Sequence, residues 1–329
     1  MLILVFFTFA TSFAFYGDPL DMTALLFFGL FVISLAVLLW ASDLFIDSAE
    51  KIGLSLGISP FIIGVTIVAF GTSLPELATA IISVLEQEST LVVSTVIGSN
   101  VTNIALVLGL VAVVVKNIDL DYNIWYRDMA HLWGSAFLMF LILSDFQVTM
   151  IESFLLLAGI VIFLTHSFKS DDDNEKLEQT QVSWLTYASL LVGGFLVYLG
   201  ADYTVYAIKE LSALANIDSK IIGLSAVALG TSLPEIIVSL NAARKGKTSM
   251  AVGNVLGSNI FNTYVVLGIP ALIGPLEIPT DINSFYLPLM LIMTVLFGLM
   301  SNNKNFSRSE GLLLIVFYLF FLSEMFKGF

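Results

Sequence analysis

Cysteine is absent from this chain of 329 residues. A disulfide framework, a cysteine-bound zinc cluster and a thiol nucleophile are therefore excluded. Histidine is scarce, since only His131 and His166 are present and no His-Glu-x-x-His motif occurs. The sequence therefore argues against a zinc site.

Charged residues are also few, at 12% of the chain, and the net charge of −13 comes mostly from loops. The 13 basic residues form no patch that would bind a nucleic acid, so no nucleic-acid partner is expected. Hydrophobic residues make up 58% of the chain, and apolar runs of 18 or more residues recur along it. The strands of a membrane β-barrel would be short and would alternate apolar and polar residues, which is not the pattern seen here. The fold class predicted is an all-α polytopic membrane protein embedded in a lipid bilayer.

Hydrophobic periodicity predicts ten transmembrane helices in two sets of five. The first set covers approximately residues 22–48, 58–84, 91–115, 128–144 and 149–167. The second set covers approximately residues 184–208, 219–242, 249–273, 284–302 and 309–327.

The domain organisation follows from these sets. Residues 22–167 form the first five-helix repeat, residues 168–183 an acidic linker, and residues 184–329 the second five-helix repeat. Residues 1–21 are either a signal-like segment or an N-terminal apolar extension. The acidic run at 170–175 is interpreted as a solvated connector, because it lacks the glycine and glutamate of a calcium-binding EF-hand loop.

A duplicated motif dominates the sequence. The hexapeptide Gly-Thr-Ser-Leu-Pro-Glu occurs at residues 71–76 and again at 230–235, 159 positions later. The same offset relates Gly-Ser-Asn-x-x-Asn at residues 98–103 to its copy at 257–262, which indicates an internal duplication. Because each copy holds an odd number of spans, the two must enter the membrane from opposite sides. This is the inverted-repeat plan of secondary transporters, whose site lies at mid-membrane on broken helices.

Basic residues predict the orientation of the bundle. With the N-terminal end of the first span outside, ten of the 13 basic residues lie in inside loops. The prediction is a multi-pass protein of the cell inner (plasma) membrane with residues 168–183 in the cytoplasm.

The two hexapeptides have the chemistry of a cation site. Glu76 and Glu235 lie in apolar spans without a basic neighbour in sequence. A charged carboxylate at mid-membrane costs about 2.5–3.5 kcal/mol on the insertion scale. Pro75 cannot donate a hydrogen bond to the carbonyl of Gly71, and Pro234 likewise frees a carbonyl in the second copy. Carbonyls, hydroxyls and carboxylates are the oxygen ligands that suit sodium and calcium.

Simpler interpretations stay open for some of these residues. Helix packing would explain the small residues, and the proline could be a tolerated kink, but this interpretation does not explain the two glutamates. Asn103 and Asn262 could ligate ions or form interhelical hydrogen bonds. Asp43 and Asp202 lie near span ends and are interpreted as interfacial or structural.

The paired Gly-Thr-Ser-Leu-Pro-Glu motifs, each followed by Gly-Ser-Asn-x-x-Asn, resemble the alpha repeats of the sodium/calcium exchangers in the calcium/cation antiporter superfamily. The resemblance covers the chain from about residue 22, and it is to the compact prokaryotic members because the central linker is short. The family's fold is ten transmembrane helices in two inverted five-helix repeats.

The resemblance also implies ligands by position. Glu76 and Glu235 would bind both calcium and sodium, and the carbonyls of Thr72 and Thr231 would complete the calcium site. An inner sodium site would use Ser73, Ser99 and the carbonyl of Ala69, an outer one Ser232, Ser258 and the carbonyl of Ala228, and the central position Asn103 and Asn262. Several relatives, including potassium-dependent ones, have an aspartate where this chain has Asn262. The central position here therefore has one fewer titratable group, which argues against potassium dependence.

The function expected is secondary antiport, in which sodium is exchanged for calcium by alternating access. Such a transporter is not an enzyme, needs no cofactor and implies no obligatory protein partner. The first span and the span at 184–208 are expected to slide past the other helices. The alternatives are a proton/calcium or other cation antiporter on the same fold and, more remotely, an intramembrane enzyme that uses two carboxylates.

Overall fold

The computed structural model describes residues 22–87, 89–119, 128–171, 182–214, 232–303 and 305–327. The predictions for residues 1–21, for most of the linker at 168–183 and for the first part of the span at 219–242 lie outside these residues.

Almost all of the described chain is helical. The helices of the first half are α2 (Met22–Ser55), α3 (Pro60–Ile63), η1 (Gly64–Val68), α4 (Ala69–Thr72), α5 (Leu74–Leu85), α6 (Ser89–Val101), η2 (Thr102–Val107), α7 (Leu108–Val115), α9 (Met129–Ile142), η3 (Leu143–Asp145) and α10 (Met150–Asp171). Those of the second half are α11 (Trp184–Leu214), α13 (Leu233–Arg244), α14 (Thr248–Phe261), η4 (Asn262–Val266), α15 (Gly268–Ile273), η5 (Ile282–Tyr286), α16 (Leu287–Met300), η6 (Ser301–Asn303) and α17 (Arg308–Lys327).

Within the described ranges, six helices are long and apolar enough to cross a membrane. They cover Thr23–Ser55, Ser89–Val115, Met150–Phe168, Trp184–Leu211, Thr248–Ile273 and Ile282–Met300. The pair Pro60–Thr72 and Leu74–Leu85, bent by 41° at the break between them, would add a seventh. The predicted class, a helical membrane protein, is confirmed, whereas the number of ten spans stays a prediction.

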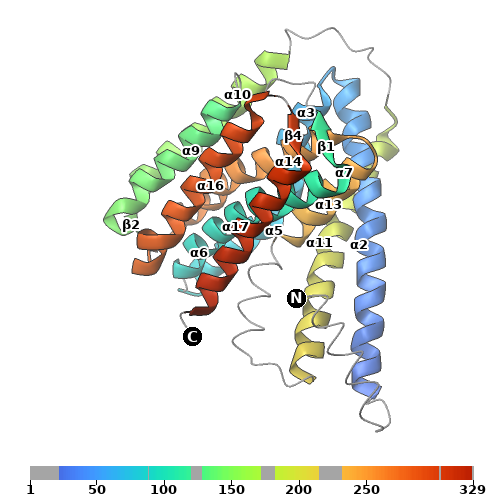
Figure 1. Ribbon diagram of the computed structural model, residues 1–329, viewed down its shortest axis with the longest axis horizontal. Helices are drawn as coiled ribbons and strands as arrows, with labels where there is room; N and C mark the ends of the chain where they lie inside the picture. The colour runs from blue at the N-terminus through green and yellow to red at the C-terminus, as the bar shows by residue number, and fades with distance from the viewer. Residues whose placement is uncertain are drawn as a thin grey trace.

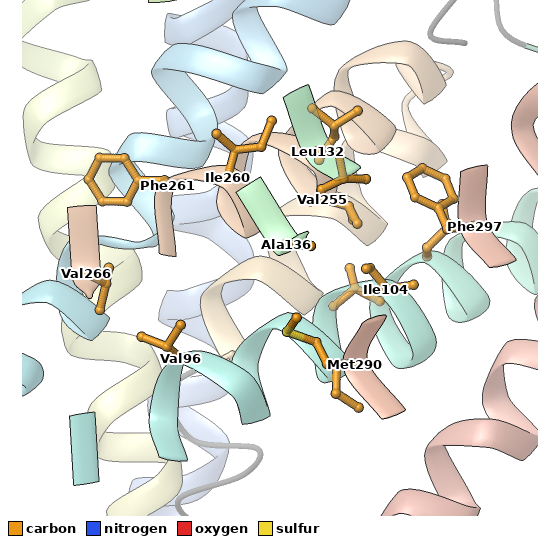
Figure 2. Packing of buried hydrophobic residues seen from close by; sticks show 14 of the residues in the cluster. Val96, Ile104, Leu132, Ala136, Val255, Ile260, Phe261, Val266, Met290 and Phe297 are labelled. Atoms are coloured by element: carbon orange, nitrogen blue, oxygen red, sulfur yellow. The ribbon is translucent and has the colours of Figure 1, made fainter. Parts of the chain in front are cut away.

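Burial divides the spans into a centre and a periphery. The spans Ser89–Val115 and Thr248–Ile273 bury 78% and 83% of their most apolar window, whereas Thr23–Ser55 and Trp184–Leu211 bury only 22%. The first two are repeat counterparts and form the centre of the bundle. Figure 2 shows side chains that pack there, including Val96 and Ile104 from one of these spans.

The two longest helices form a separate pair. Figure 1 shows α2 and α11 side by side along one edge of the bundle, with the shorter helices packed together beside them. A Cβ atom on Gly200 of α11 would lie 2.9 Å from the Cα atom of Leu38 on α2, so a larger residue would separate the two backbones. Close backbone approach at small residues is how membrane helices pack tightly. The structure therefore places the two helices expected to slide in one closely packed unit.

In the described part of the chain, two short β-ribbons link the halves. Strand β1 (Asn117–Asp119) pairs antiparallel with β4 (Asn305–Ser307), and β2 (Gln147–Val148) pairs antiparallel with β3 (Leu276–Glu277). The repeat offset of 159 positions takes β1 onto β3 and β2 onto β4. Each ribbon is therefore the repeat counterpart of the other, as expected for two copies related by a two-fold axis.

An ionic cluster joins α2 to the turn between α13 and α14; it consists of Asp43, Asp47, Glu50, Lys245 and Lys247. The Nζ atom of Lys245 lies 3.1 Å from Asp43 Oδ1 and 3.0 Å from Asp47 Oδ2. The Nζ atom of Lys247 lies 2.7 Å from Asp47 Oδ1 and 2.9 Å from Glu50 Oε2. Burial disfavours the charged form of Lys247, but its hydrogen bonds with Asp47 and Glu50 outweigh burial and raise its pKa. The ion pair of Asp43 fits its predicted structural role.

Candidate ion-binding site

In both hexapeptides a serine with the same backbone dihedral angles precedes a helix. Ser73 separates α4 from α5 with φ −91° and ψ 4°, and Ser232 precedes α13 with φ −90° and ψ 5°. The proline that follows occupies the first turn of the next helix in each copy, where its missing N–H costs no hydrogen bond within that helix. Ser73 and Ser232 therefore have the same backbone geometry at the start of the following helix.

The first break removes one helical hydrogen bond, as the position of Pro75 predicts. Before the break, the N–H of Ser73 donates to the carbonyl of Ala69 at 3.0 Å, and after it the N–H of Leu77 donates to that of Ser73 at 3.2 Å. Pro75 has no N–H to donate to the carbonyl of Gly71, four residues before it. The carbonyl of Gly71 therefore lacks its usual helical donor and is a candidate ligand for a cation.

The two glutamates are fully buried in the first turns of α5 and α13. The hydroxyl of Ser73 donates to Oε1 of Glu235 at 3.2 Å, so the break in one repeat meets the carboxylate of the other. Within the described part of the chain, neither carboxylate oxygen of Glu76 has a hydrogen-bond partner, and neither does Oε2 of Glu235. Because buried polar atoms are normally paired, these oxygens indicate a ligand position between the repeats.

Asn103 and Asn262 lie in π-helical turns. The backbone carbonyl of Asn103 accepts from Leu108, and that of Asn262 accepts from Leu267 at 3.0 Å, in each case five residues later. Both side-chain amides are fully buried, and none of their polar atoms has a partner among the described residues. π-Helical turns are frequent at functional sites. Two unpaired amides at equivalent turns fit the interpretation that they line an ion cavity.

Small residues bring the broken helix against α14. A methyl group on Gly257 would overlap the carbonyl oxygen of Val65 and would lie 2.7 Å from the Cβ atom of Ala69. Only glycine allows this approach. As a result, the Oγ1 atom of Thr72 lies 3.5 Å from the Oγ atom of Ser258, so residues assigned to different ion positions become neighbours.

Most of the predicted site residues are in one buried region. The structure buries Ala69, Thr72, Ser73, Glu76, Ser99, Asn103, Ser232, Glu235, Ser258 and Asn262. Thr231 and Ala228 lie outside the described residues. Across the described ranges no group of three or more His, Cys, Asp or Glu could hold a metal, so any cation here would be held by two carboxylates and neutral oxygens.

Sequence reasoning missed two polar residues beside the break. The hydroxyl of Thr72 donates to Oδ1 of Asn254 at 3.3 Å, and Nδ2 of Asn254 donates to the Oγ atom of Ser239 at 2.9 Å. The repeat offset takes Asn254 to Thr95 and Ser239 to Ala80, so a search for duplicated residues passes over both. An amide within an apolar span was the signal that could have found Asn254.

The two histidines, separate in sequence, lie together in the fold. The rings of His131 and His166 have centroids 4.6 Å apart, between α9 and α10. Neither is among the residues of the candidate site.

Two buried carboxylates, each in the first turn of a helix and one beside a helix break, lie within two repeats of membrane-spanning helices. This arrangement defines the class of cation-transporting secondary transporters. The comparisons with known proteins agree. The model of the family described as sodium/calcium exchanger protein matches residues 26–169 and 185–327, one segment in each repeat.

Relatives match over nearly the whole chain. The sodium/calcium exchanger MaX1 of Methanosarcina acetivorans is 33% identical, over 91% of this chain and 98% of its own length. The inner membrane protein YrbG of Escherichia coli is 31% identical, over 86% of this chain and 90% of its own. A solved structure of the sodium-calcium exchanger NCX_Mj, soaked with sodium and strontium, superposes with a TM-score of 0.81 at 30% identity, covering 91% of this chain and 99% of that one.

The chain belongs to the sodium/calcium exchanger protein family. The resemblance to compact prokaryotic members is therefore confirmed. The family consists of membrane antiporters, so the expectation that this protein is not an enzyme is confirmed as well.

Proposed function

We propose that this protein exchanges sodium for calcium across the cell's plasma membrane, with both ions bound at mid-membrane between the two repeats. The observation that carries the proposal is the pair of fully buried glutamates, Glu76 and Glu235, three of whose four carboxylate oxygens have no partner in the described part of the chain. The family and its named sodium/calcium exchangers support the identity of the ions.

In this proposal the ligands are those of the two hexapeptides and the motifs that follow them. Glu76 and Glu235 bind either ion, and the carbonyls of Thr72 and Thr231 complete the calcium site. The sodium positions use Ser73, Ser99 and the carbonyl of Ala69 on one side, and Ser232, Ser258 and the carbonyl of Ala228 on the other. Asn103 and Asn262 line the centre.

Charge explains why such a site exchanges ions instead of leaking them. Two ionised glutamates carry two negative charges, which one calcium ion or two sodium ions neutralise. An empty ionised pair at mid-membrane would carry a penalty of about 5–7 kcal/mol, twice the value for one carboxylate. The transporter therefore changes sides when loaded and resists doing so when empty.

The moving part is the pair of helices α2 and α11, which slides past the other helices and opens the site to one side at a time. The close packing of this pair and the low burial of both helices support that division. The linker at 168–183 faces the cytoplasm, so the ionic cluster at the end of α2 lies on the cytoplasmic side.

The test is calcium uptake by proteoliposomes that contain the purified protein and an internal sodium load. We expect uptake when external sodium is replaced by choline, and no uptake when the internal sodium is replaced by lithium. Uptake should continue when choline replaces potassium on both sides, because Asn262 offers a neutral amide where several relatives have an aspartate. Uptake driven by a pH gradient alone would instead favour the proton/calcium alternative.

A further inference from the structure

Thr72 lies at the first helix break, next to the calcium site and the inner sodium position of the proposal. Its hydroxyl has one proton and several possible acceptors. Its Oγ1 atom lies 3.3 Å from the carbonyl oxygen of Ala69 and 3.3 Å from Oδ1 of Asn254. The carboxylate of Glu235 also lies close enough to interact with this hydroxyl. Which acceptor takes the proton decides which of these oxygens stays free to bind an ion.

The carbonyl of Ala69 has only one lone pair to offer. A carbonyl oxygen has two lone pairs, and the N–H of Ser73 already donates to this one at 3.0 Å. If the hydroxyl of Thr72 took the second, as threonine hydroxyls commonly do in helices, Ala69 could not bind a cation. Elsewhere in this protein such bonds are short, at 2.6 Å from Thr66 to Ile62 and 2.9 Å from Thr165 to Ile162. The bond from Thr72 to Ala69 is longer, at 3.3 Å, and the contact with Oδ1 of Asn254 has the same length, so these two acceptors compete for one proton.

Asn254 is built to receive that proton. Its Nδ2 atom donates to the Oγ atom of Ser239 at 2.9 Å, which turns Oδ1 toward Thr72. Asn254, Ser239 and Thr72 are all at most 1% exposed, so no bulk water competes for these bonds. Unlike the carboxylate of Glu235, the amide oxygen of Asn254 is not one of the proposed ion ligands, so it can accept the proton while ions are bound.

We infer that Asn254 is a positioning residue: by accepting the hydroxyl proton of Thr72, it keeps one lone pair of the Ala69 carbonyl free for sodium. The pair is not duplicated in the sequence, because the repeat counterparts of Asn254 and Ser239 in the first repeat are Thr95 and Ala80, and alanine offers no hydrogen-bonding group. The two sodium positions of the proposal are therefore not equivalent in this respect. This inference rests on the proposed function.

The test compares sodium and calcium KM values in proteoliposomes. Asn254→Leu keeps most of the side-chain volume but removes the acceptor, so the Thr72 proton returns to Ala69. We expect the sodium KM to rise about tenfold, the effect of one lost polar contact, with the calcium KM changed less than twofold. Thr95→Val, the matched change in the other repeat, should leave both values at those of the wild type.

A double-substitution experiment separates proton placement from packing. Thr72→Val removes the hydroxyl, so nothing competes for the Ala69 carbonyl, and adding Asn254→Leu should then produce no further rise in the sodium KM. If Asn254→Leu does not fold, Asn254→Ala removes the same acceptor and is held to the same expectations.

Three results would overturn the inference: an unchanged sodium KM, an equal rise in both KM values, or a sodium defect that persists in the Thr72→Val background. Failure of the wild type to couple calcium uptake to sodium would be seen before any substitution is tested. That result would defeat the proposed function, and this inference with it.

Discussion

At the scale of single residues, the site depends most on the charges of Glu76 and Glu235. Both are fully buried, and no ion pair with a basic side chain forms at either within the described ranges. Replacing either glutamate therefore leaves no basic side chain unpaired. The effect of such a substitution on exchange reports on the bound ion.

Replacing Glu76 or Glu235 with Gln is expected to abolish exchange. The change keeps side-chain size but removes one unit charge, whose attraction to a divalent ion 4 Å away is about 8 kcal/mol at an effective dielectric of 20. Calcium's dehydration offsets much of this, but a net loss of about 3 kcal/mol would weaken binding about a hundredfold. Calcium binding and flux by the purified variants are the measurements.

The control for this prediction is Glu86→Gln, at the exposed end of the same helix α5. It should exchange normally, and both buried variants should still fold, since losing an uncompensated buried charge tends to stabilise the empty protein. Near-normal exchange by Glu76→Gln or Glu235→Gln would contradict the two-carboxylate site.

At the scale of elements, the ionic cluster ties the sliding pair to the rest of the protein. Lys245 and Lys247 hold the last turns of α2, and nearby Nδ2 of Asn241 on α13 donates to the Oγ atom of Ser42 and, at 3.3 Å, to the carbonyl of Leu39. All these contacts lie along one face of α2. They must separate if α2 slides past α13, so they favour the state described here.

We expect Lys247→Ala to shift the population toward the opposite state about fivefold. The substitution removes two partly exposed ion pairs, which together contribute about 1 kcal/mol. Because the chain has no cysteine, Ser42→Cys can report the opening, since Ser42 is fully buried at this interface. Its rate of modification by a water-soluble thiol reagent should rise in the Lys247→Ala background.

Lys209→Ala is the matched control. Lys209 on α11 is the repeat counterpart of Glu50, is exposed, and has no ion pair in the described chain. Its removal should leave the labelling rate of Ser42→Cys unchanged. Equal rates in the wild-type and Lys247→Ala backgrounds would show that the cluster does not hold this interface closed.

The sequence predicted these elements unequally. The helix break at Ser73 was predictable because a proline has no N–H and a buried carboxylate needs a partner, and both features are local. The ionic cluster was not, because Asp47 and Lys247 are 200 positions apart and each looks like an ordinary interfacial charge. The π-helical turns at Asn103 and Asn262 arise from a one-residue shift of backbone hydrogen bonds, which leaves no hydrophobic pattern.

At the scale of the whole molecule, loops predicted to share a membrane side do touch. The strands of the β1–β4 ribbon follow Lys116 and precede Arg308, both predicted inside. The β2–β3 ribbon joins two loops predicted outside, and the N–H of Glu277 there donates to Ser89 Oγ at 3.4 Å. The strands themselves were not predicted, because two or three residues are too few to show alternation.

Single cysteines on the two ribbons test which side is cytoplasmic. Gln147 on β2 and Asn305 on β4 are both exposed. A membrane-impermeant thiol reagent should modify Gln147→Cys in intact cells and Asn305→Cys only after the cells are opened. The reverse pattern would overturn the orientation that the basic residues predict.

The ribbons also set a condition on any protein built from half of this chain. In each ribbon, a strand of the first repeat pairs with a strand of the second, and the two ribbons are repeat counterparts. Two identical half-length chains could make the same pairings only as a symmetric dimer in which each lends strands to the other. One copy would have to insert facing outward and the other inward. A gene for such a half could not encode one fixed orientation in the membrane, because both orientations would be needed. When two copies are joined in one chain, the sequence of each copy can specify its own orientation.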